Sequence, residues 1–451
     1  MLKIYPEKVV DYLEKKSLKK WELEWLEISG IQVAIVIPAT CEFENIRRVL
    51  LSLAKNDKPC LQKSLVIFVI NNSVSSDSEV KDDNNQSVTF LREIIERKSS
   101  DNIAGIIFNS GIQIGLIDAA SEGKEFNDDE GGVGLARKVG MDTALKIFDY
   151  SASEKKIIIS LDADCVVEGN YLDDIIRSFT KFNFSAATVD FEHNYFEEGV
   201  NRQGIISYEL FLRHYVAGLL FAQSPYAFHT IGSTTVCDHE AYIKVGGMNT
   251  KKAAEDFYFL QKLAKHFRIN RIDSTKVRPS ARESWRVPFG TGRSMIDFSS
   301  KKKNISVYDA DIYIILKDWL ELLHSDLSLN LSQIFNETKK IHPELYNFLE
   351  SRGFSKDWEK ILTNSKSARQ LDYQRKNWFD AFETLKLIHH LRDTSFPMME
   401  IKAGVEKLFQ VVQQSVKFEL SGEKNTIENL YAYFLSELKL LETKLYKKYY
   451  K

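Results

Sequence analysis

The segment KKIIISLDADCVVEGNYL, residues 155–172, constrains the fold of this chain more than any other segment. The apolar run from Ile157 to Leu161 has the length and β-branched content of a fully buried strand, and such strands belong to parallel sheets covered by helices. In open α/β sheets the ligand lies beyond the carboxyl ends of the strands, which is where Asp162 and Asp164 follow. Two residues apart in an extended segment, both carboxylates can face one cation or polar ligand. The alternative is a pair of solvated turn aspartates.

The composition is that of an ordinary globular protein and argues against several classes. The chain has 451 residues, of which 44% are hydrophobic and 27% charged, with a formal net charge of −2. This balance gives no general attraction to nucleic acid, and it leaves contact with an anionic lipid surface open. No run approaches the roughly 18 apolar residues that span a bilayer, and the N-terminus lacks a signal-peptide core. The four scattered cysteines form no CxxC pair, so we expect a reduced, cytoplasmic protein.

Strand-like and helix-like segments alternate in the first two thirds of the chain. Apolar runs at 31–39 and 64–73 each end in polar residues, and a helical pattern follows the first of them. A further helix is expected to begin near Gly134 and to lead into the strand of the opening segment. This alternation predicts an α/β fold with a mostly parallel sheet and right-handed crossovers. The polar stretches 75–87 and 118–132 are predicted to be loops around a ligand crevice.

The composition changes after about residue 305, where apolar residues recur at helical spacing and only three of the 21 glycines remain. We therefore predict a helical lead-in over residues 1–30, an α/β domain over residues 31–300 and an all-α C-terminal domain over residues 301–451. The residues expected to share one packing face of the lead-in are Trp21, Trp25 and Ile28.

The end of the chain carries a short heptad pattern and then a basic, tyrosine-rich tail. At under three heptads, the pattern favours a packing face within the domain, and a homodimer contact is the alternative. The tail KLYKKYYK, residues 444–451, is either solvated or in contact with acidic lipid headgroups. The heptad residues are Ile427, Tyr431, Phe434, Leu438, Leu441 and Leu445.

Five segments resemble, in order and approximate spacing, the family 2 nucleotide-sugar glycosyltransferases with the GT-A fold. They are VAIVIPATCEFENIRRVLLSL, VINNSVSSD, GVGLARKVGMDTAL, IISLDADCVV and GSTTVCDHEAYIKVGGMNTKKAAEDFYFLQKLAK, and together they cover about residues 31–295. No single segment is specific, but the ordered set is. The resemblance implies a GT-A-type, Rossmann-like sheet flanked by helices and the transfer of a sugar from a nucleotide-diphosphate donor to an acceptor hydroxyl.

The resemblance also implies roles for single positions. Asp164, the last carboxylate of the DxD motif, would bind Mg²⁺ or Mn²⁺, while Asp162 would contact the ribose and the metal. Asp256, in the ED pair at a helix start, would be the catalytic base, and Arg137 would lie near the diphosphate or the nucleobase. The residues implied to hold the nucleobase are Pro38, Ala39, Thr40, Glu42, Asn71 and Asn72.

The chemistry of sugar transfer from a nucleotide diphosphate requires the same groups. A departing diphosphate gathers negative charge, which a cation at Asp164 would neutralise. An acceptor hydroxyl is a poor nucleophile until a carboxylate takes its proton, and Asp256 at a helix N-terminus suits that role because the macrodipole favours the ionised form. A single displacement with this base predicts inversion, and a retaining reaction stays open. Taken alone, the ED pair would be an ordinary helix start.

The segment RPSARESWRVPFGTGRSM, residues 278–295, is predicted to be either a lid that closes over the donor phosphates or an interdomain linker with salt bridges. As a lid it would use Arg286 to contact the donor, with Arg282 and Arg293 as alternatives. His229 and His239 are expected to be ordinary partly buried histidines rather than metal ligands.

The predicted function is therefore a metal-dependent glycosyltransferase acting on a saccharide or lipid-linked saccharide, in the cytoplasm or at the inner face of the membrane. The resemblance implies an envelope or surface polysaccharide as product. One alternative is a non-catalytic GT-A scaffold that binds a nucleotide sugar, although binding alone needs no base. Another is a haloacid-dehalogenase-type phosphatase, whose similar DADCV motif normally follows the first strand of its domain. The sequence departs from the family at INNS, where many members carry an aspartate, so uracil specificity stays open; it also departs at Lys138, where asparagine is frequent.

Overall fold

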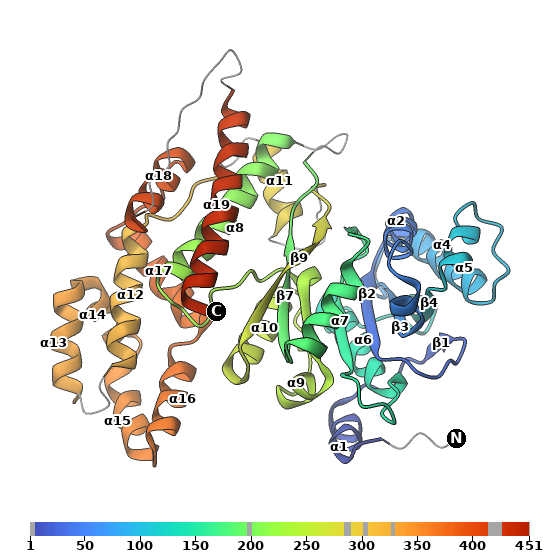
Figure 1. Cartoon of the computed structure of the whole chain (residues 1–451), viewed down its shortest axis with the longest axis horizontal. Coiled ribbons are helices and arrows are strands. Elements are labelled where there is room, and N and C mark those ends of the chain that lie inside the picture. The colour runs from blue at the N-terminus through green and yellow to red at the C-terminus, as the bar shows by residue number, and fades with distance from the viewer. Residues whose placement is uncertain are drawn as a thin grey trace. The chain divides into compact units, whose positions relative to one another are not determined.

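The chain folds into two compact units, which Figure 1 labels element by element. The sheet unit comprises residues 1–194 and 230–280, and the helical unit comprises residues 195–229 and 281–451. The α/β part and the all-α part are thus both present. The computed structural model describes residues 5–195, 201–283, 290–300, 305–325, 330–413 and 426–450.

A single nine-stranded sheet, in the order β1-β4-β3-β2-β5-β8-β7-β9-β6, forms the centre of the sheet unit. Pairing is parallel within β4-β3-β2-β5 and between β7 and β9, so six strands share one direction while β1, β6 and β8 oppose it. The predicted mostly parallel sheet is confirmed. The strands are β1 (Leu23–Trp25), β2 (Val33–Ala39), β3 (Ser64–Asn71), β4 (Gln113–Ala119), β5 (Ile157–Ser160), β6 (Cys165–Val167), β7 (Ala186–Phe191), β8 (Thr235–Asp238) and β9 (Ile269–Pro279).

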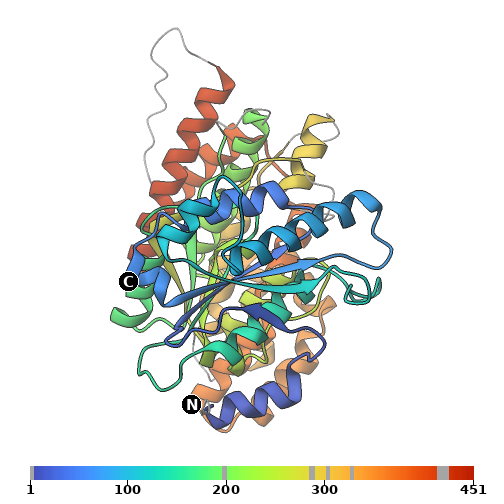
Figure 2. The same ribbon diagram turned by 90° about the vertical axis from the view of Figure 1, so that its right-hand side faces the viewer.

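Helices cover both faces of this sheet, and its central strands β2 and β3 are therefore buried along their whole length. Alternate residues of β2 and β3 pack with α2, α4, α5 and α7, and Figure 2 shows the blue α2 and α4 on one side of the strands. Helix α6 packs on the opposite face, where a Cβ on Gly140 would meet Val36 at 2.4 Å. The helices are α1 (Glu7–Lys16), α2 (Phe43–Leu53), α3 (Lys58–Gln62), α4 (Ser78–Ile95), α5 (Ala104–Ser110), α6 (Val133–Ile147), α7 (Tyr171–Lys181), α9 (His239–Lys244) and α10 (Glu255–His266), with the 3₁₀ turn η1 (Gly232–Thr234).

The N-terminal segment is helical only in its first part. Helix α1 ends at Lys16, and Leu23–Trp25 pairs antiparallel with β4 as an edge strand. The expected helical face of Trp21, Trp25 and Ile28 is therefore wrong. The physical reason is a tertiary contact: Gly115 of β4 has no side chain, and a Cβ there would lie 2.8 Å from the Leu23 side chain.

The stretch 75–87, predicted to be a loop, begins helix α4 instead. Asp77 caps the helix by accepting a hydrogen bond from the Val80 amide at 3.0 Å. Asn84 and Ser87 are buried together with Val80, because polar side chains face inward at helical spacing. The sequence does not show the helical spacing of apolar residues here, because two of the inward-facing positions, Asn84 and Ser87, are polar.

A second hydrophobic core holds the helical unit together, and it explains why residues 195–229 belong there. Helix α8 is apolar on most of its surface, and its buried residues share this core with α12 and α19. Five of the six heptad residues of α19 are buried in the same unit, so the heptad pattern forms an internal packing face, and Ile427 is exposed. The helices are α8 (Arg202–Phe221), α11 (Thr291–Ser299), α12 (Asp311–His324), α13 (Leu331–Ile341), α14 (Pro343–Ser351), α15 (Phe354–Asn364), α16 (Ala368–Trp378), α17 (Ala381–Thr394), α18 (Ile401–Val411) and α19 (Ile427–Tyr450).

Within the described residues, no helix combines the length and the apolar character needed to cross a bilayer. The tail of α19 is partly packed, because the Tyr450 hydroxyl donates a hydrogen bond to the Ser224 carbonyl at 2.6 Å.

Candidate active site

The DxD motif lies directly beyond the carboxyl end of the central strand β5. All four residues of β5 are buried, as predicted for this run. Asp162 and Asp164 follow in a turn, which the Cys165 amide closes by donating to the Asp162 carbonyl at 3.1 Å. The expected extended geometry is therefore replaced by a turn. The turn still collects the two carboxylates and the Cys165 thiol, whose ligand atoms lie within 4.8 Å of one another.

The chemistry of this group fits a hard divalent cation. Both aspartates keep partial contact with solvent, and carboxylate oxygens are the ligands that Mg²⁺ and Mn²⁺ prefer. The Cys165 thiol is buried, and burial raises its pKa well above the usual value, so without a bound metal it is protonated. Within the described part of the chain, no histidine joins this group.

Arg137 of helix α6 links the DxD motif to the ED pair. Its side chain is only 4% exposed, and its guanidinium donates to the carboxylates of both Asp162 and Glu255. Gly232 leaves room for this guanidinium, because a Cβ there would displace the Arg137 side chain from its present position. The resemblance implies that Arg137 lies near a diphosphate or nucleobase. In the structure, two carboxylates hold its guanidinium.

The ED pair stands at the start of helix α10, directly after an unusual backbone conformation. Ala254 has a φ of 58°, in the left-handed region that a side chain disfavours. The Asn249 side chain donates to the Glu255 carbonyl at 2.8 Å, which fixes this turn from the other side. Glu255 is buried against Arg137, whereas Asp256 keeps partial solvent access and accepts from the Phe257 amide at 2.7 Å.

Burial raises the pKa of Asp256 to about 7, with the neighbouring Glu255 carboxylate raising it further and Arg137 opposing both. These effects outweigh the helix macrodipole, which was expected to favour ionised Asp256. Burial alone would lower the pKa of Arg137, but Asp162, Glu255 and Asp256 raise it above its usual value. Three carboxylates thus face one guanidinium. The surplus of negative charge can be balanced by a proton on Asp256 or by a cation at the DxD motif.

The predicted nucleobase residues are brought together at the carboxyl ends of β2 and β3. The Asn71 side chain donates to the Ala39 carbonyl at 3.2 Å, and the Thr40 hydroxyl donates to the Asn71 carbonyl at 2.8 Å. Pro38 lies within β2, opposite Val69 of β3.

Asn84 of helix α4 completes this network, although the sequence did not single it out. Its side-chain nitrogen donates to the Asn71 carbonyl at 3.0 Å and to the Asn72 side-chain oxygen at 2.9 Å, and its oxygen accepts from the Cys41 amide at 2.9 Å. Glu42, also buried, accepts from the Asn45 side chain. The signal for Asn84 was its place on a capped helix, four residues before Val88 and seven before Leu91.

The segment predicted to be a lid is described only in part. Arg286 lies outside the described residues. Arg293 belongs to the helical unit, where it pairs with Asp297 at 3.2 Å on helix α11. Both histidines are partly buried or buried as expected: His229 contacts Glu442 at 3.1 Å, and burial lowers the pKa of His239.

No family model and no curated protein matches this chain. The solved structures to which this chain is similar include glycosyltransferases. TarS of S. aureus in complex with UDP-GlcNAc is 14% identical, with a TM-score of 0.38 over 87% of this chain and 95% of that one. The mannosyltransferase PcManGT from Pyrobaculum calidifontis in complex with GDP-Man and Mn²⁺ is 12% identical, with a TM-score of 0.35 over 97% and 92%.

Glucosyl-3-phosphoglycerate synthase from Mycobacterium tuberculosis, in complex with Mn²⁺, UDP-Glc and phosphoglyceric acid, is 12% identical, with a TM-score of 0.34 over 67% of this chain and 86% of that one. At such similarity, function has to be argued from the residues of this chain.

Proposed function

We propose that this protein is a metal-dependent, inverting glycosyltransferase that moves a sugar from a nucleotide diphosphate to an acceptor hydroxyl. The observation that carries the proposal is the meeting of two carboxylate motifs on one buried arginine. Arg137 joins Asp162 of the DxD turn to Glu255 of the ED pair. Binding of a sugar nucleotide needs only the first motif, so the second argues for chemistry.

Asp256 is the proposed base. Its pKa of about 7 lies near the operating pH of a cytoplasmic enzyme, where a base combines ionisation with proton affinity. As the acceptor oxygen attacks the anomeric carbon, its proton passes to the Asp256 carboxylate and the nucleoside diphosphate leaves from the opposite face. Glu255 cannot share this role because its carboxylate is buried against Arg137.

Asp162 and Asp164 would hold the divalent cation, Mg²⁺ or Mn²⁺, which when bound neutralises the charge that grows on the departing diphosphate. Arg137 contacts Asp162 and so engages one oxygen of that carboxylate, and both aspartates keep partial solvent access. With Asp162 engaged by Arg137, Asp164 is proposed as the principal metal ligand.

The hydrogen-bonded ends of β2 and β3 are the proposed nucleobase site. Thr40, Asn71 and Asn72 carry groups that donate and accept, as the edge of a base requires. Asn84 donates hydrogen bonds to Asn71 and Asn72 and so holds these two residues in position. A saccharide or lipid-linked saccharide is the proposed acceptor, and assembly of a surface polysaccharide is the proposed setting.

The phosphatase alternative fits this geometry less well. It needs the first aspartate of the motif as a nucleophile, yet an Asp162 oxygen is held by the buried Arg137. The motif also follows β5 rather than the first strand of the unit.

A thermal-shift panel tests the proposal without knowledge of the acceptor. UDP, GDP, ADP, CDP and dTDP, and their common sugar conjugates, are each added with Mn²⁺, with Mg²⁺ or with chelator. A ligand that binds only the folded state raises apparent stability by RT ln(1 + [L]/Kd), about 2.7 kcal/mol at 100 times Kd. We expect one nucleoside diphosphate to give a metal-dependent shift. A shift with phosphate analogues alone would favour the phosphatase, and no shift with any nucleotide contradicts the proposal.

A further inference from the structure

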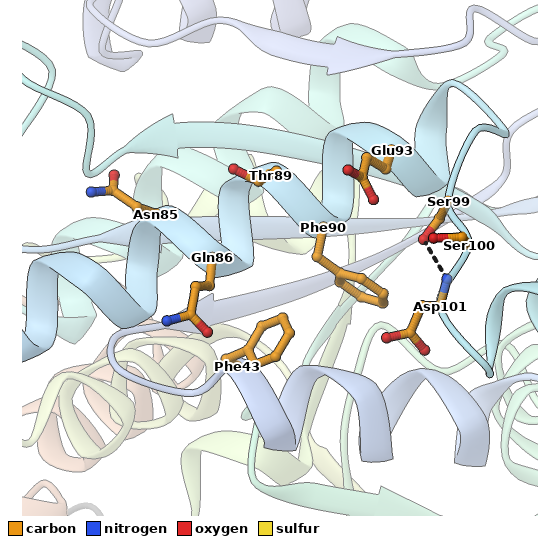
Figure 3. A pocket seen from close by; sticks show the side chains of 9 residues that line it. All are labelled: Phe43, Asn85, Gln86, Thr89, Phe90, Glu93, Ser99, Ser100 and Asp101. Atoms are coloured by element: carbon orange, nitrogen blue, oxygen red, sulfur yellow. Dashed lines mark hydrogen bonds between the residues drawn. The ribbon is translucent and has the colours of Figure 1, made fainter.

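A pocket of about 480 Å³ opens on the sheet unit away from the DxD turn, between the start of α2, one face of α4 and the loop at 99–101. Figure 3 shows the rings of Phe43 and Phe90 at its centre, with side-chain amides at one end and carboxyl and hydroxyl groups at the other. Its volume falls within the range of about 300–1,000 Å³ typical of small-molecule sites. The lining residues are Phe43, Asn85, Gln86, Thr89, Phe90, Glu93, Ser99, Ser100 and Asp101.

The polar lining is matched to hydroxyl groups rather than to phosphates. Five of the nine residues carry a neutral amide or hydroxyl, and none is a lysine or arginine. Amides and hydroxyls both donate and accept hydrogen bonds, as do sugar hydroxyls. Glu93 and Asp101 add carboxylates, of which Asp101 is paired with Arg47, so the exposed Glu93 is the one that repels a phosphate and accepts well from a sugar hydroxyl. A second nucleotide is therefore a poor occupant.

The aromatic floor is fixed before any ligand arrives. Phe90 is 5% exposed, and its ring meets the half-buried Phe43 ring edge-on with centroids 5.8 Å apart. Arg47 lies over Phe43 and bonds Asp101 at 3.2 Å and Asn102 at 2.8 Å, which ties the loop to helix α2. The half-buried Phe43 ring, held edge-on by Phe90 and ringed by hydrogen-bonding groups, offers an apolar surface to the C–H face of a pyranose, and a preformed site loses little entropy on binding.

We propose that this pocket binds an uncharged saccharide segment of the acceptor glycan, remote from the reacting hydroxyl. The choice of occupant rests on the proposed glycosyltransferase function. The pocket shares both its helices with the proposed nucleobase site: Phe43 follows Glu42 directly, and Asn84 lies on the same helix as Gln86. A basic peptide is the competing occupant, since the exposed Glu93 carboxylate would attract it.

The test measures binding rather than transfer. Maltohexaose, cellohexaose and chitohexaose are titrated against the full chain by saturation-transfer NMR, with hexalysine for comparison. Thr89→Arg places a long cation into the pocket from an exposed helical position. Asp82→Arg also introduces an arginine, with a larger change of charge, at an exposed position of α4 that does not line the pocket.

We expect at least one hexaose to bind at millimolar concentration or below, with affinity reduced about tenfold or more by Thr89→Arg and less than about twofold by Asp82→Arg. Nucleotide-dependent thermal shifts should be equal in both variants. The proposal is overturned if no hexaose binds, if both variants weaken binding equally, or if hexalysine alone binds. If a hexaose binds at this pocket but no nucleotide gives a thermal shift, the proposed donor site has failed while the saccharide site stands. The two failures can therefore be distinguished.

Discussion

Two buried arginines, one in each unit, are each held between two carboxylates, but their surroundings differ. Arg137 bonds Asp162 and Glu255 in the sheet unit. Arg213 of the helical unit bonds Glu209 at 2.9 Å and Glu442 at 3.0 Å. Side chains in the second cluster are completely buried, whereas the Asp162 side chain is 34% exposed.

The two arginine clusters also differ in their balance of charge. Lys439 approaches Glu209 at 3.3 Å and His229 contacts Glu442 at 3.1 Å, so each buried glutamate meets a further basic side chain. Around Arg137 the surplus is negative, because Asp256 adds its field to those of Asp162 and Glu255. A closed and balanced cluster serves to join helices α8 and α19, while an open cluster with surplus charge is suited to bind a cation and to exchange a proton.

The largest effect is expected from Asp256→Asn. Removal of the proposed base should lower the transfer rate by about 10²- to 10⁴-fold while donor affinity stays within about twofold. Turnover with the nucleotide sugar identified by thermal shift measures the first, and calorimetric titration the second. Asp173→Asn, at a half-exposed carboxylate of α7, is the control. Transfer near the unmodified rate would remove Asp256 from the mechanism.

Arg213→Met tests the other side of the comparison. Two buried glutamates lose their shared partner, so the free energy of unfolding should fall by about 3–5 kcal/mol. The matched control is Arg352→Met in the same unit, where the arginine side chain is 39% exposed and its pair with Glu383 should contribute at most about 1 kcal/mol. Urea unfolding followed by tryptophan fluorescence reports both. Equal losses would show that burial and balance do not distinguish the clusters.

Asp164→Asn should weaken the metal-dependent part of donor binding by about 10- to 100-fold and leave the free energy of unfolding nearly unchanged. Asp164 is only partly buried, so the charge that the substitution removes is partly solvated. Mn²⁺ titration in the presence of the nucleotide measures the change. Full metal-dependent affinity in this variant would sink the assignment of Asp164 as ligand.

The smallest effect is the pH dependence of transfer. Because the pKa of Asp256 is raised to about 7 and a base must be ionised, kcat/KM should rise with pH and level off above that value. Below it the rate should fall about tenfold per pH unit. A bound cation adds positive charge and moves the inflection to lower pH, so Mg²⁺ concentration should shift the profile. A rate that increases as pH falls would contradict the role of a base.

Much of the fold follows from local pattern. The buried run before Asp162 could be assigned to a central strand, because a run of β-branched residues without polar interruption is typical of a strand covered on both faces. The polar sequence of α4 and the edge strand β1 were misread, since each is decided by a partner distant in the chain: the β-strand ends that Asn84 binds, and Gly115 of β4.

By itself, the sequence determined the alternation of strands and helices, the place of the DxD motif directly after β5, the helix start at the ED pair and the helical character of the C-terminal part. These features depend on residues close together in the chain. Only the tertiary structure decided that Arg137 joins the two motifs, that burial and Glu255 raise the pKa of Asp256, and that α8 belongs to the helical unit. Ion pairing, desolvation and core packing depend on what surrounds a side chain in space, and no local spacing encodes that.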